Sequence, residues 1–392
     1  MKQEIIRRNG RFWPRISWVV LSILTLAIWG PTSVQAEPYL AIQEGYKCSK
    51  CHVNMTGGGK RNDFANIYVQ TRLTNDFFDW RRYKVESDEE IDEEENPLKT
   101  DSSNSFFSGR LNDYIAIGGD FRAILDRNEE PGSPSDDVFR QRKQNIYLEV
   151  NLIPDRILFY QTMDGGGDAR EIFGLYQGKF KEEPYYFKAG QFFLPFGMRL
   201  QDDTAFIRAA TGFTYGTTDV GVEFGYEPGP WALHAALTNG TGASTENNGG
   251  KQLTASAAYV DKGYRIGGSY TTGKNGQGVE TSMWGINGGA QFGRIGILAE
   301  IDFIDNSTVE QQIALAELNF LVSRGNNVKF SYEYHDPDEA IFENALERYS
   351  LVYEPFLNQF LQLRAGVRES KGIPQNPGLN DTYSFLELHL FL

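Results

Sequence analysis

From about residue 113 onward, the chain consists of segments of about ten residues in which apolar and polar side chains alternate. The alternation is clearest at 146–152, 297–303, 328–335 and 361–368. Because successive side chains of a β-strand point to opposite faces of its sheet, each segment presents one apolar and one polar face. Glycine, proline, asparagine and aspartate bound the segments, as they do in strands joined by turns. The pattern favours an all-β fold with one face toward lipid and one toward water.

About sixteen such segments can be marked, and a bacterial outer-membrane barrel requires an even number of strands. Their connections alternate between short and long, the short ones including 154–155, 182–184 and 293–294. A soluble pair of β-sandwiches is the alternative, but it would not require this regular asymmetry. We therefore predict an outer-membrane β-barrel of about sixteen strands over 106–392. The expected strands lie near 113–125, 139–153, 156–164, 170–180, 185–193, 219–227, 231–239, 252–260, 264–272, 281–292, 295–304, 311–322, 327–335, 347–355, 360–370 and 382–392.

Composition agrees with a barrel and argues against two other classes of protein. Aromatic residues make up 14% of the chain and glycine contributes 41 residues, as expected of an aromatic-rich, glycine-rich β protein. No long apolar run follows residue 36, which excludes transmembrane helices beyond that point. The 52 acidic residues outnumber the 38 basic ones, which argues against a nucleic-acid partner.

Two segments N-terminal to the barrel are expected to lie outside it. Residues 1–36 have the pattern of a signal peptide, with basic residues before apolar 16–29 and small residues around Val34 and Ala36. An uncleaved anchor is the alternative, although the apolar stretch is shorter than the roughly 18 residues that span a bilayer. Residues 84–105 are rich in aspartate and glutamate and predict an acidic linker, either a plain spacer or a docking site for a cationic cytochrome.

The chain's 2 cysteines lie in Cys48-Ser49-Lys50-Cys51-His52, the C-x-x-C-H pattern of c-type haem attachment. The chemistry requires this spacing because each thiol adds to one vinyl group of the porphyrin while the adjacent histidine supplies an axial nitrogen to the iron. A structural disulfide and a thioredoxin-like redox pair are alternatives, but a redox motif belongs beside a βαβ pattern and needs no following histidine. We therefore predict one covalently attached haem c, bound by Cys48, Cys51 and His52 in a haem segment over 37–83.

The residues after this motif predict a short helix and a turn. Phe64, Ile67 and Tyr68 recur at helical spacing, which indicates a helix within 63–73 packed over the porphyrin. The run 57–60 has a glycine-glycine-glycine-lysine sequence, but Asn54 stands where a phosphate-binding loop needs a glycine. We expect a flexible turn there. Met55 is too close to the motif to reach the opposite face of the iron readily.

Strand direction ranks the candidates for the sixth iron ligand. Short turns of outer-membrane barrels face the periplasm, so both chain ends should lie there and the haem segment should enter from that side. His234 and His389 fall on polar strand faces near that end and are the candidate ligands, although a lone histidine in a lumen is often only a solvated polar residue. Three other residues are expected near the outer rim: His335, Met163 and Met283.

The lumen of a sixteen-stranded barrel is wide enough for an aqueous channel, and the haem segment could enter it as a plug. The longest connection, about 194–219, contains three phenylalanines. It either folds inward as a constriction or forms a surface loop.

A leader, a C-x-x-C-H motif soon after it, a short haem segment and a porin-like barrel resemble the fused monohaem cytochrome c-porins of the outer membrane of iron-oxidising bacteria. At residue level the resemblance is carried by 45–52, where glycine and tyrosine precede the motif. Residues 190–197 also resemble a recurrent strand-to-loop segment of phosphate-selective-type porins. The first resemblance implies electron transfer from extracellular Fe(II) through the haem to a periplasmic cytochrome or another acceptor.

Two further functions are compatible with the same residues. A diffusion porin could use the haem segment as a structural plug or a redox-controlled gate, and a haem enzyme acting on a small oxidant would need an open iron position. The outer membrane lipid is an expected partner in every case, and a homotrimer is compatible with the sequence. Acidic residues in the long loops could gather Fe(II), or they could serve only outer-surface solubility.

Overall fold

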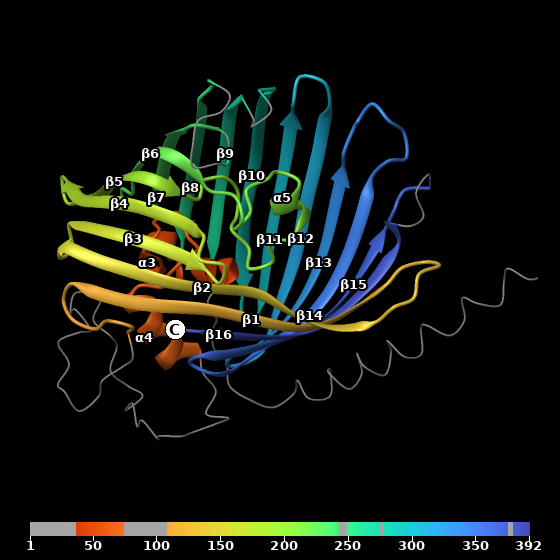
Figure 1. The fold of residues 1–392 in the computed structure, drawn as a ribbon, viewed down its shortest axis with the longest axis horizontal. Coiled ribbons are helices and arrows are strands. Elements are labelled where there is room, and N and C mark those ends of the chain that lie inside the picture. Colours follow the sequence, from red (N-terminus) through yellow and green to blue (C-terminus); the bar gives the residue numbers. More distant parts are fainter. Residues whose placement is uncertain (1–36, 74–107, 241, 243–248, 275–277, 375–378) are drawn as a thin grey trace, which may run out of the picture.

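The structure, a computed structural model, describes residues 37–73, 108–240, 242, 249–274, 278–374 and 379–392 (Figure 1). The expected signal peptide over 1–36, the last part of the haem segment (74–83) and the acidic linker over 84–105 lie outside the described residues.

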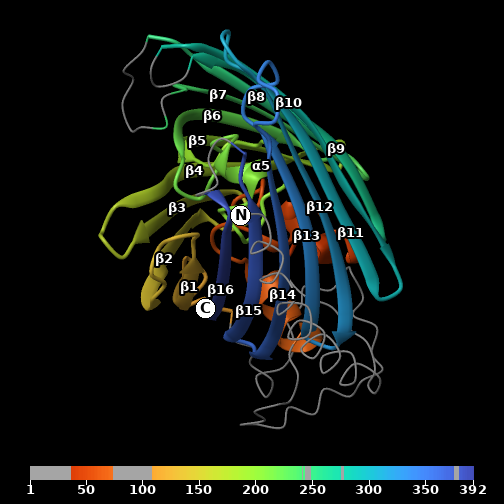
Figure 2. The same cartoon turned by 90° about the vertical axis from the view of Figure 1, so that its right-hand side faces the viewer.

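Within the described residues, 16 antiparallel strands form one closed barrel, in which each strand pairs with its neighbours in sequence and β1 pairs with β16 (Figures 1 and 2). This confirms the predicted fold, because each expected segment corresponds to one strand with ends shifted by a few residues. The strands are β1 Ile115–Glu129, β2 Asp137–Ile153, β3 Ile157–Asp164, β4 Ala169–Phe180, β5 Glu183–Phe192, β6 Asp219–Tyr226, β7 Trp231–Thr238, β8 Gln252–Asp261, β9 Tyr264–Lys274, β10 Glu280–Phe292, β11 Ile295–Asp305, β12 Glu310–Ser323, β13 Asn326–Asp336, β14 Leu346–Asn358, β15 Leu361–Lys371 and β16 Asp381–Phe391.

Strand β11 shows how the alternation is arranged in space. Ile295 and Ile297 are 40% and 42% exposed, whereas Glu300 and Asp302 on the opposite face are buried. Charged side chains therefore point into the barrel and apolar ones point out, the reverse of a water-soluble protein. An outward apolar face and a polar interior are what an outer-membrane barrel requires.

The N-terminal segment folds into short helices inside the ring of strands, toward one end of the barrel, as both views show (Figures 1 and 2). We call residues 37–73 the plug. Its elements are α2 Pro38–Glu44, α3 Cys48–Cys51, α4 Asp63–Tyr68 and a π-helical turn, η1 Val69–Leu73. The helix expected within 63–73 is confirmed as α4 and η1. In the described part of the chain, no helix is long and apolar enough to cross a membrane.

Helix α2 fixes the plug to the barrel end that carries the short turns. It begins with Pro38, whose missing N–H costs nothing at this position, and it ends at Gly45, whose φ is 71°. A Cβ at Gly45 would lie 2.6 Å from the backbone nitrogen of Lys262 in the short β8–β9 turn. The N–H of Gly263 in the same turn donates to the Ile42 carbonyl at 2.8 Å. Glycine is thus needed at residue 45 both for the left-handed conformation and for the close approach.

The long connection between β5 and β6, residues 193–218, lies inside the barrel and carries the short helix α5 Phe206–Ala209 (Figure 1). We call it the inward loop. Helix α5 contacts β11, β12 and β13, and Ile207 and Arg208 are buried. Of the two alternatives raised by the sequence, folding inward is therefore the one the chain adopts.

Candidate haem-binding site

The C-x-x-C-H segment and the loop after it form a compact unit. Helix α3 contains Cys48 and Cys51, and His52 follows it directly and pairs with Arg61 in an isolated β-bridge. The N–H of Val53 donates to the Lys60 carbonyl at 3.1 Å. The chain between residues 53 and 60 therefore turns back on itself, so that His52 and Arg61 lie side by side at its base.

The glycine run in this loop is packed against the barrel wall, which corrects the expectation of a flexible turn. Gly57, Gly58 and Gly59 have φ values of 93°, 80° and 65°. Residues other than glycine rarely adopt such values. A Cβ at Gly58 would lie 2.8 Å from Cδ of Arg199, and one at Gly59 would lie 2.6 Å from the Tyr160 hydroxyl. The glycines thus let the loop backbone approach the wall and the inward loop closely.

Buried polar contacts hold the plug to strands β2 to β5. Asn54 donates to Oε1 of Glu171 at 2.6 Å and accepts from Nζ of Lys188 at 3.0 Å. Nζ of Lys60 lies 3.0 Å from Oε2 of Glu149, and both side chains are buried. Because a buried charge is costly without a partner, these pairs favour one fixed position of the plug.

Further contacts tie the plug to the other side of the barrel. The Ser49 hydroxyl donates to Oε2 of Glu227 at 2.6 Å, at the short turn before β7. Lys329 on β13 forms an ion pair with Glu37 at the start of the plug. The plug is therefore held from several directions within the barrel.

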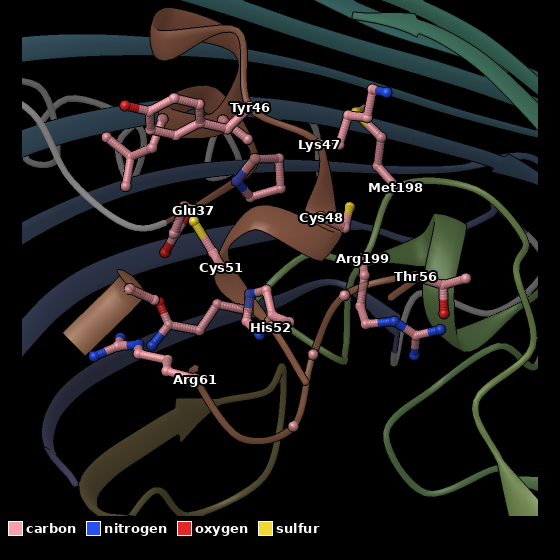
Figure 3. Close-up of a pocket in the computed structure, with 18 of the residues that line it drawn as sticks. Glu37, Tyr46, Lys47, Cys48, Cys51, His52, Thr56, Arg61, Met198 and Arg199 are labelled. Atoms are coloured by element: carbon pink, nitrogen blue, oxygen red, sulfur yellow. The ribbon is translucent and has the colours of Figure 1, made fainter. Parts of the chain in front are cut away.

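A cavity lies between the plug, the inward loop and the inner face of the barrel, and Cys48, Cys51 and His52 all line it (Figure 3). Both cysteines are free thiols. In Figure 3 the Cys51 sulfur lies to the left of the Cys48 sulfur near the middle of the view, and the His52 ring lies below both. This arrangement fits a porphyrin held by two thioether bonds with an imidazole on one face.

The state of His52 suits a metal ligand. Burial, together with the nearby cations Arg61 and Arg199, lowers the pKa of His52 to about 4. The imidazole is therefore neutral at neutral pH, which is the form that coordinates metals. Its Nδ1 atom is buried and has no hydrogen-bond partner among the described residues. Burial, together with the nearby Cys48, raises the pKa of the Cys51 thiol to about 12.

Cations at the cavity suit the carboxylates of a haem. Arg61 and Arg199 line the cavity, and burial lowers the pKa of Arg61 to about 10. The Arg61 guanidinium lies 4.0 Å from the ring centre of Phe391. Nε of Arg199 is buried and lacks a hydrogen-bond partner among the described residues. Buried cations favour an anion in contact with them, and haem propionates are such anions.

The two histidines predicted as sixth ligands both line this cavity, but their ring nitrogens already have polar neighbours. Nδ1 of His389 lies 2.9 Å from Nε2 of Gln201, and its Nε2 lies 3.0 Å from Oδ1 of Asp120. Nδ1 of His234 lies 3.3 Å from the Ser256 hydroxyl, and its Nε2 lies 3.5 Å from Oε1 of Glu227. Nε2 of each histidine is buried and makes no hydrogen bond within the described residues, so coordination there would displace only the carboxylate beside it.

The three residues expected near the outer rim, His335, Met163 and Met283, do not line the cavity, and neither does Met55, which the sequence sets aside. The Met55 sulfur lies 3.7 Å from Nε2 of Gln177, beside a separate hollow at the short-turn end. The inward loop instead contributes Met198 and Arg199 to the cavity. Sequence reasoning missed both residues and also Arg61. The sequence offered only two indications of these residues. Met198 and Arg199 lie in the long connection, and Arg61 lies in the haem segment.

No protein-family model matches the sequence, and no curated protein matches it. Solved structures do match. The anion-selective porin from Comamonas acidovorans aligns with a TM-score of 0.56 and 10% identity over 71% of this chain and 99% of that one. OprB of Pseudomonas putida aligns with a TM-score of 0.56 and 12% identity over 72% and 95%. OmpT of Vibrio cholerae, in its trimer form, aligns with a TM-score of 0.54 and 12% identity over 71% and 99%.

These likenesses concern the fold, because the identities are low. With the closed barrel of 16 strands and its outward apolar face, they define the chain as a porin-like β-barrel of the outer membrane. A plug carrying a C-x-x-C-H motif inside the barrel distinguishes this chain's own lumen.

Proposed function

We propose that this protein carries one haem c, attached through Cys48 and Cys51, in the barrel lumen and transfers electrons in the outer membrane. The observation that carries the proposal is the position of the C-x-x-C-H segment, which faces a cavity inside the barrel with a neutral histidine beside it. When bound, a haem c supplies an iron centre that takes up and releases one electron.

Different residues of the chain would bind different parts of the haem. Cys48 and Cys51 would anchor it covalently, which prevents its loss through an open pore. His52 would supply the imidazole on one face of the iron. Arg61 and Arg199 would offset the negative charge of the propionates in a buried site. The barrel wall keeps lipid away from all of these groups.

For the electron donor and acceptor, we propose extracellular Fe(II) and a periplasmic cytochrome, following the resemblance to fused cytochrome-porins. Long loops at the opposite end from the plug carry exposed acidic residues, including Asp136, Asp137, Glu339 and Glu343, which would attract Fe(II). The plug then belongs on the periplasmic side, where its short-turn end would meet the acceptor. Association of three barrels through their apolar outer faces is part of the same proposal.

A diffusion porin with a haem-bearing plug or redox gate is the second candidate, and the likeness to porins favours it. The two functions differ in whether the plug stays in place. The buried contacts of Asn54 and Lys60 with the wall support a plug that remains docked, as electron transfer through a fixed haem requires, whereas the likeness to solved porins supports the diffusion porin.

The test uses purified outer membranes and the barrel reconstituted in vesicles. The wild-type chain should retain haem on a denaturing gel, and the Cys48→Ser/Cys51→Ser variant should not. Fe(II) added outside the vesicles should then reduce the haem band rapidly. Haem that responds only to a reductant on the plug side, together with free solute flux, would favour the gated porin and contradict electron transfer from outside.

A further inference from the structure

We infer that Met198 of the inward loop supplies the sixth ligand of the haem iron, opposite His52. This inference rests on the proposed function, because it requires a haem at Cys48 and Cys51. It assigns the iron one ligand from the plug and one from the barrel.

Met198 lies where the opposite face of the porphyrin would be. It is 3% exposed and lines the same cavity as His52. In Figure 3 the His52 ring lies below the two cysteine sulfur atoms, and the Met198 side chain lies above the Cys48 sulfur, at one end of the line that joins them. Because all four residues line one cavity, a porphyrin bonded to both sulfurs and to the imidazole could take the thioether on its other face, the arrangement of histidine–methionine haems.

The backbone around Met198 is fixed on both sides. The Met198 N–H donates to Oε2 of Glu300 at 2.7 Å, and its carbonyl accepts from Nη1 of Arg208 at 3.3 Å. The preceding Gly197 has a φ of 62° and donates to the Ser269 hydroxyl at 3.0 Å. A Cβ at Gly197 would lie 2.1 Å from Oε1 of Glu300. The loop thus presents Met198 from a preorganised backbone, as a ligand held by a rigid scaffold requires.

The surroundings of the sulfur also suit a ligand to a soft metal site. Met198 packs in an apolar cluster that includes Leu40, Leu298 and Phe356. In the described residues, no hydrogen bond involves its sulfur, so coordination would break none. His234 and His389, in contrast, each have a hydrogen-bond contact at Nδ1 and a carboxylate within 3.5 Å of Nε2, although Nε2 itself makes no hydrogen bond within the described residues. A methionine in an apolar pocket is also the axial choice that raises the haem potential, as in cytochromes c.

The experiment compares Met198→Leu with Met55→Leu in the full-length protein. Leucine keeps the volume and apolar character of methionine but removes the sulfur, and Met55 serves as the matched control because it lies outside the cavity. Ferric wild-type protein and Met55→Leu should show the weak far-red band of iron–methionine sulfur bonding. Met198→Leu should lose that band, change its spin state and have a lower reduction potential, while its heat-modifiable gel mobility shows an intact barrel.

Two further variants, His234→Gln and His389→Gln, test the rival ligands and should leave the band unchanged. An unchanged spectrum in Met198→Leu, or loss of axial ligation in either histidine variant, would overturn the assignment of Met198. Haem staining of each variant separates this failure from that of the proposed function. Wild-type protein with covalent haem but no methionine band refutes only the ligand, whereas wild-type protein without covalent haem refutes both.

Discussion

The ion pair between Lys60 and Glu149 gives a sharp test of how firmly the plug is held in the barrel. The two side chains are 1% and 8% exposed, and their charged atoms lie 3.0 Å apart. Asn151 donates a further hydrogen bond to Glu149 at 2.8 Å. Replacing one partner alone, as in Lys60→Met or Glu149→Gln, removes the pair, and Lys60→Met leaves a buried carboxylate without its cation.

Breaking a buried pair from one side typically costs about 3–5 kcal/mol, whereas replacing both partners can be nearly neutral. At about 1.4 kcal/mol for each tenfold change, Lys60→Met should raise the undocked fraction of the plug by roughly two to three and a half orders of magnitude. The double variant Lys60→Met/Glu149→Gln should recover much of this loss, because no unpaired charge remains in the wall.

Single-channel conductance in planar bilayers, together with proteolysis of the plug, measures this undocking. Lys179→Met is the matched control, because its partner Glu182 is in an exposed turn pair and such pairs contribute little. Wild-type protein and this control should show rare openings, and Lys60→Met should show frequent ones. If the double variant opens as often as Lys60→Met, or if no variant opens, the reasoning from buried charge is wrong.

Three other predictions concern the loop, the site and pH. Gly59→Ala should weaken plug docking by roughly 1–3 kcal/mol, because φ is 65° and the new Cβ would lie 2.6 Å from the Tyr160 hydroxyl; a thermal shift no larger than that of a surface variant would contradict this. Arg199→Gln should lower the haem potential and Arg199→Lys should restore it, since a nearby cation favours the reduced state; redox titration checks both. Burial alone would raise the pKa of Asp202, but nearby cations, Arg368 first, hold it well below its ordinary value. Its contribution to loop stability is therefore complete above the unfolded pKa of about 3.9 and is lost only as pH falls through the lower folded pKa. Titration of Asp202 should therefore leave protease protection of the inward loop unchanged from pH 7 to about pH 4 and weaken it only in stronger acid, which comparison with Asp202→Asn checks.

The strands were predictable because a strand's side-chain period of two is visible within a single segment. Ile297 and Glu300 lie on opposite faces of β11, and this follows from their spacing along the strand alone. The proposed haem-attachment residues Cys48, Cys51 and His52 could also be named from the sequence, because that motif consists of nearly adjacent residues. Strand direction was also enough to bring His234 and His389 to the same cavity as the motif.

The role of Met198 was not predictable in this way. The position of Met198 depends on two residues that bind its backbone. Glu300 is distant in sequence, and Arg208 lies in the same irregular loop. Irregular segments have no period, so the sequence could only offer two alternatives for this connection. The packing of the glycine run was missed for a similar reason, since its partners Tyr160 and Arg199 come from other parts of the chain.

The seam between β1 and β16 has a consequence for biogenesis. His389 and Phe391, near the end of the last strand, line the cavity together with Gly119 and Asp120 of the first. Leu392 and Gly119 exchange backbone hydrogen bonds at 2.9 and 3.3 Å across this junction. The wall of the cavity is therefore completed only when the last strand joins the first. The proposed attachment of haem to the cysteines is therefore best timed before that junction forms, while the motif is still accessible.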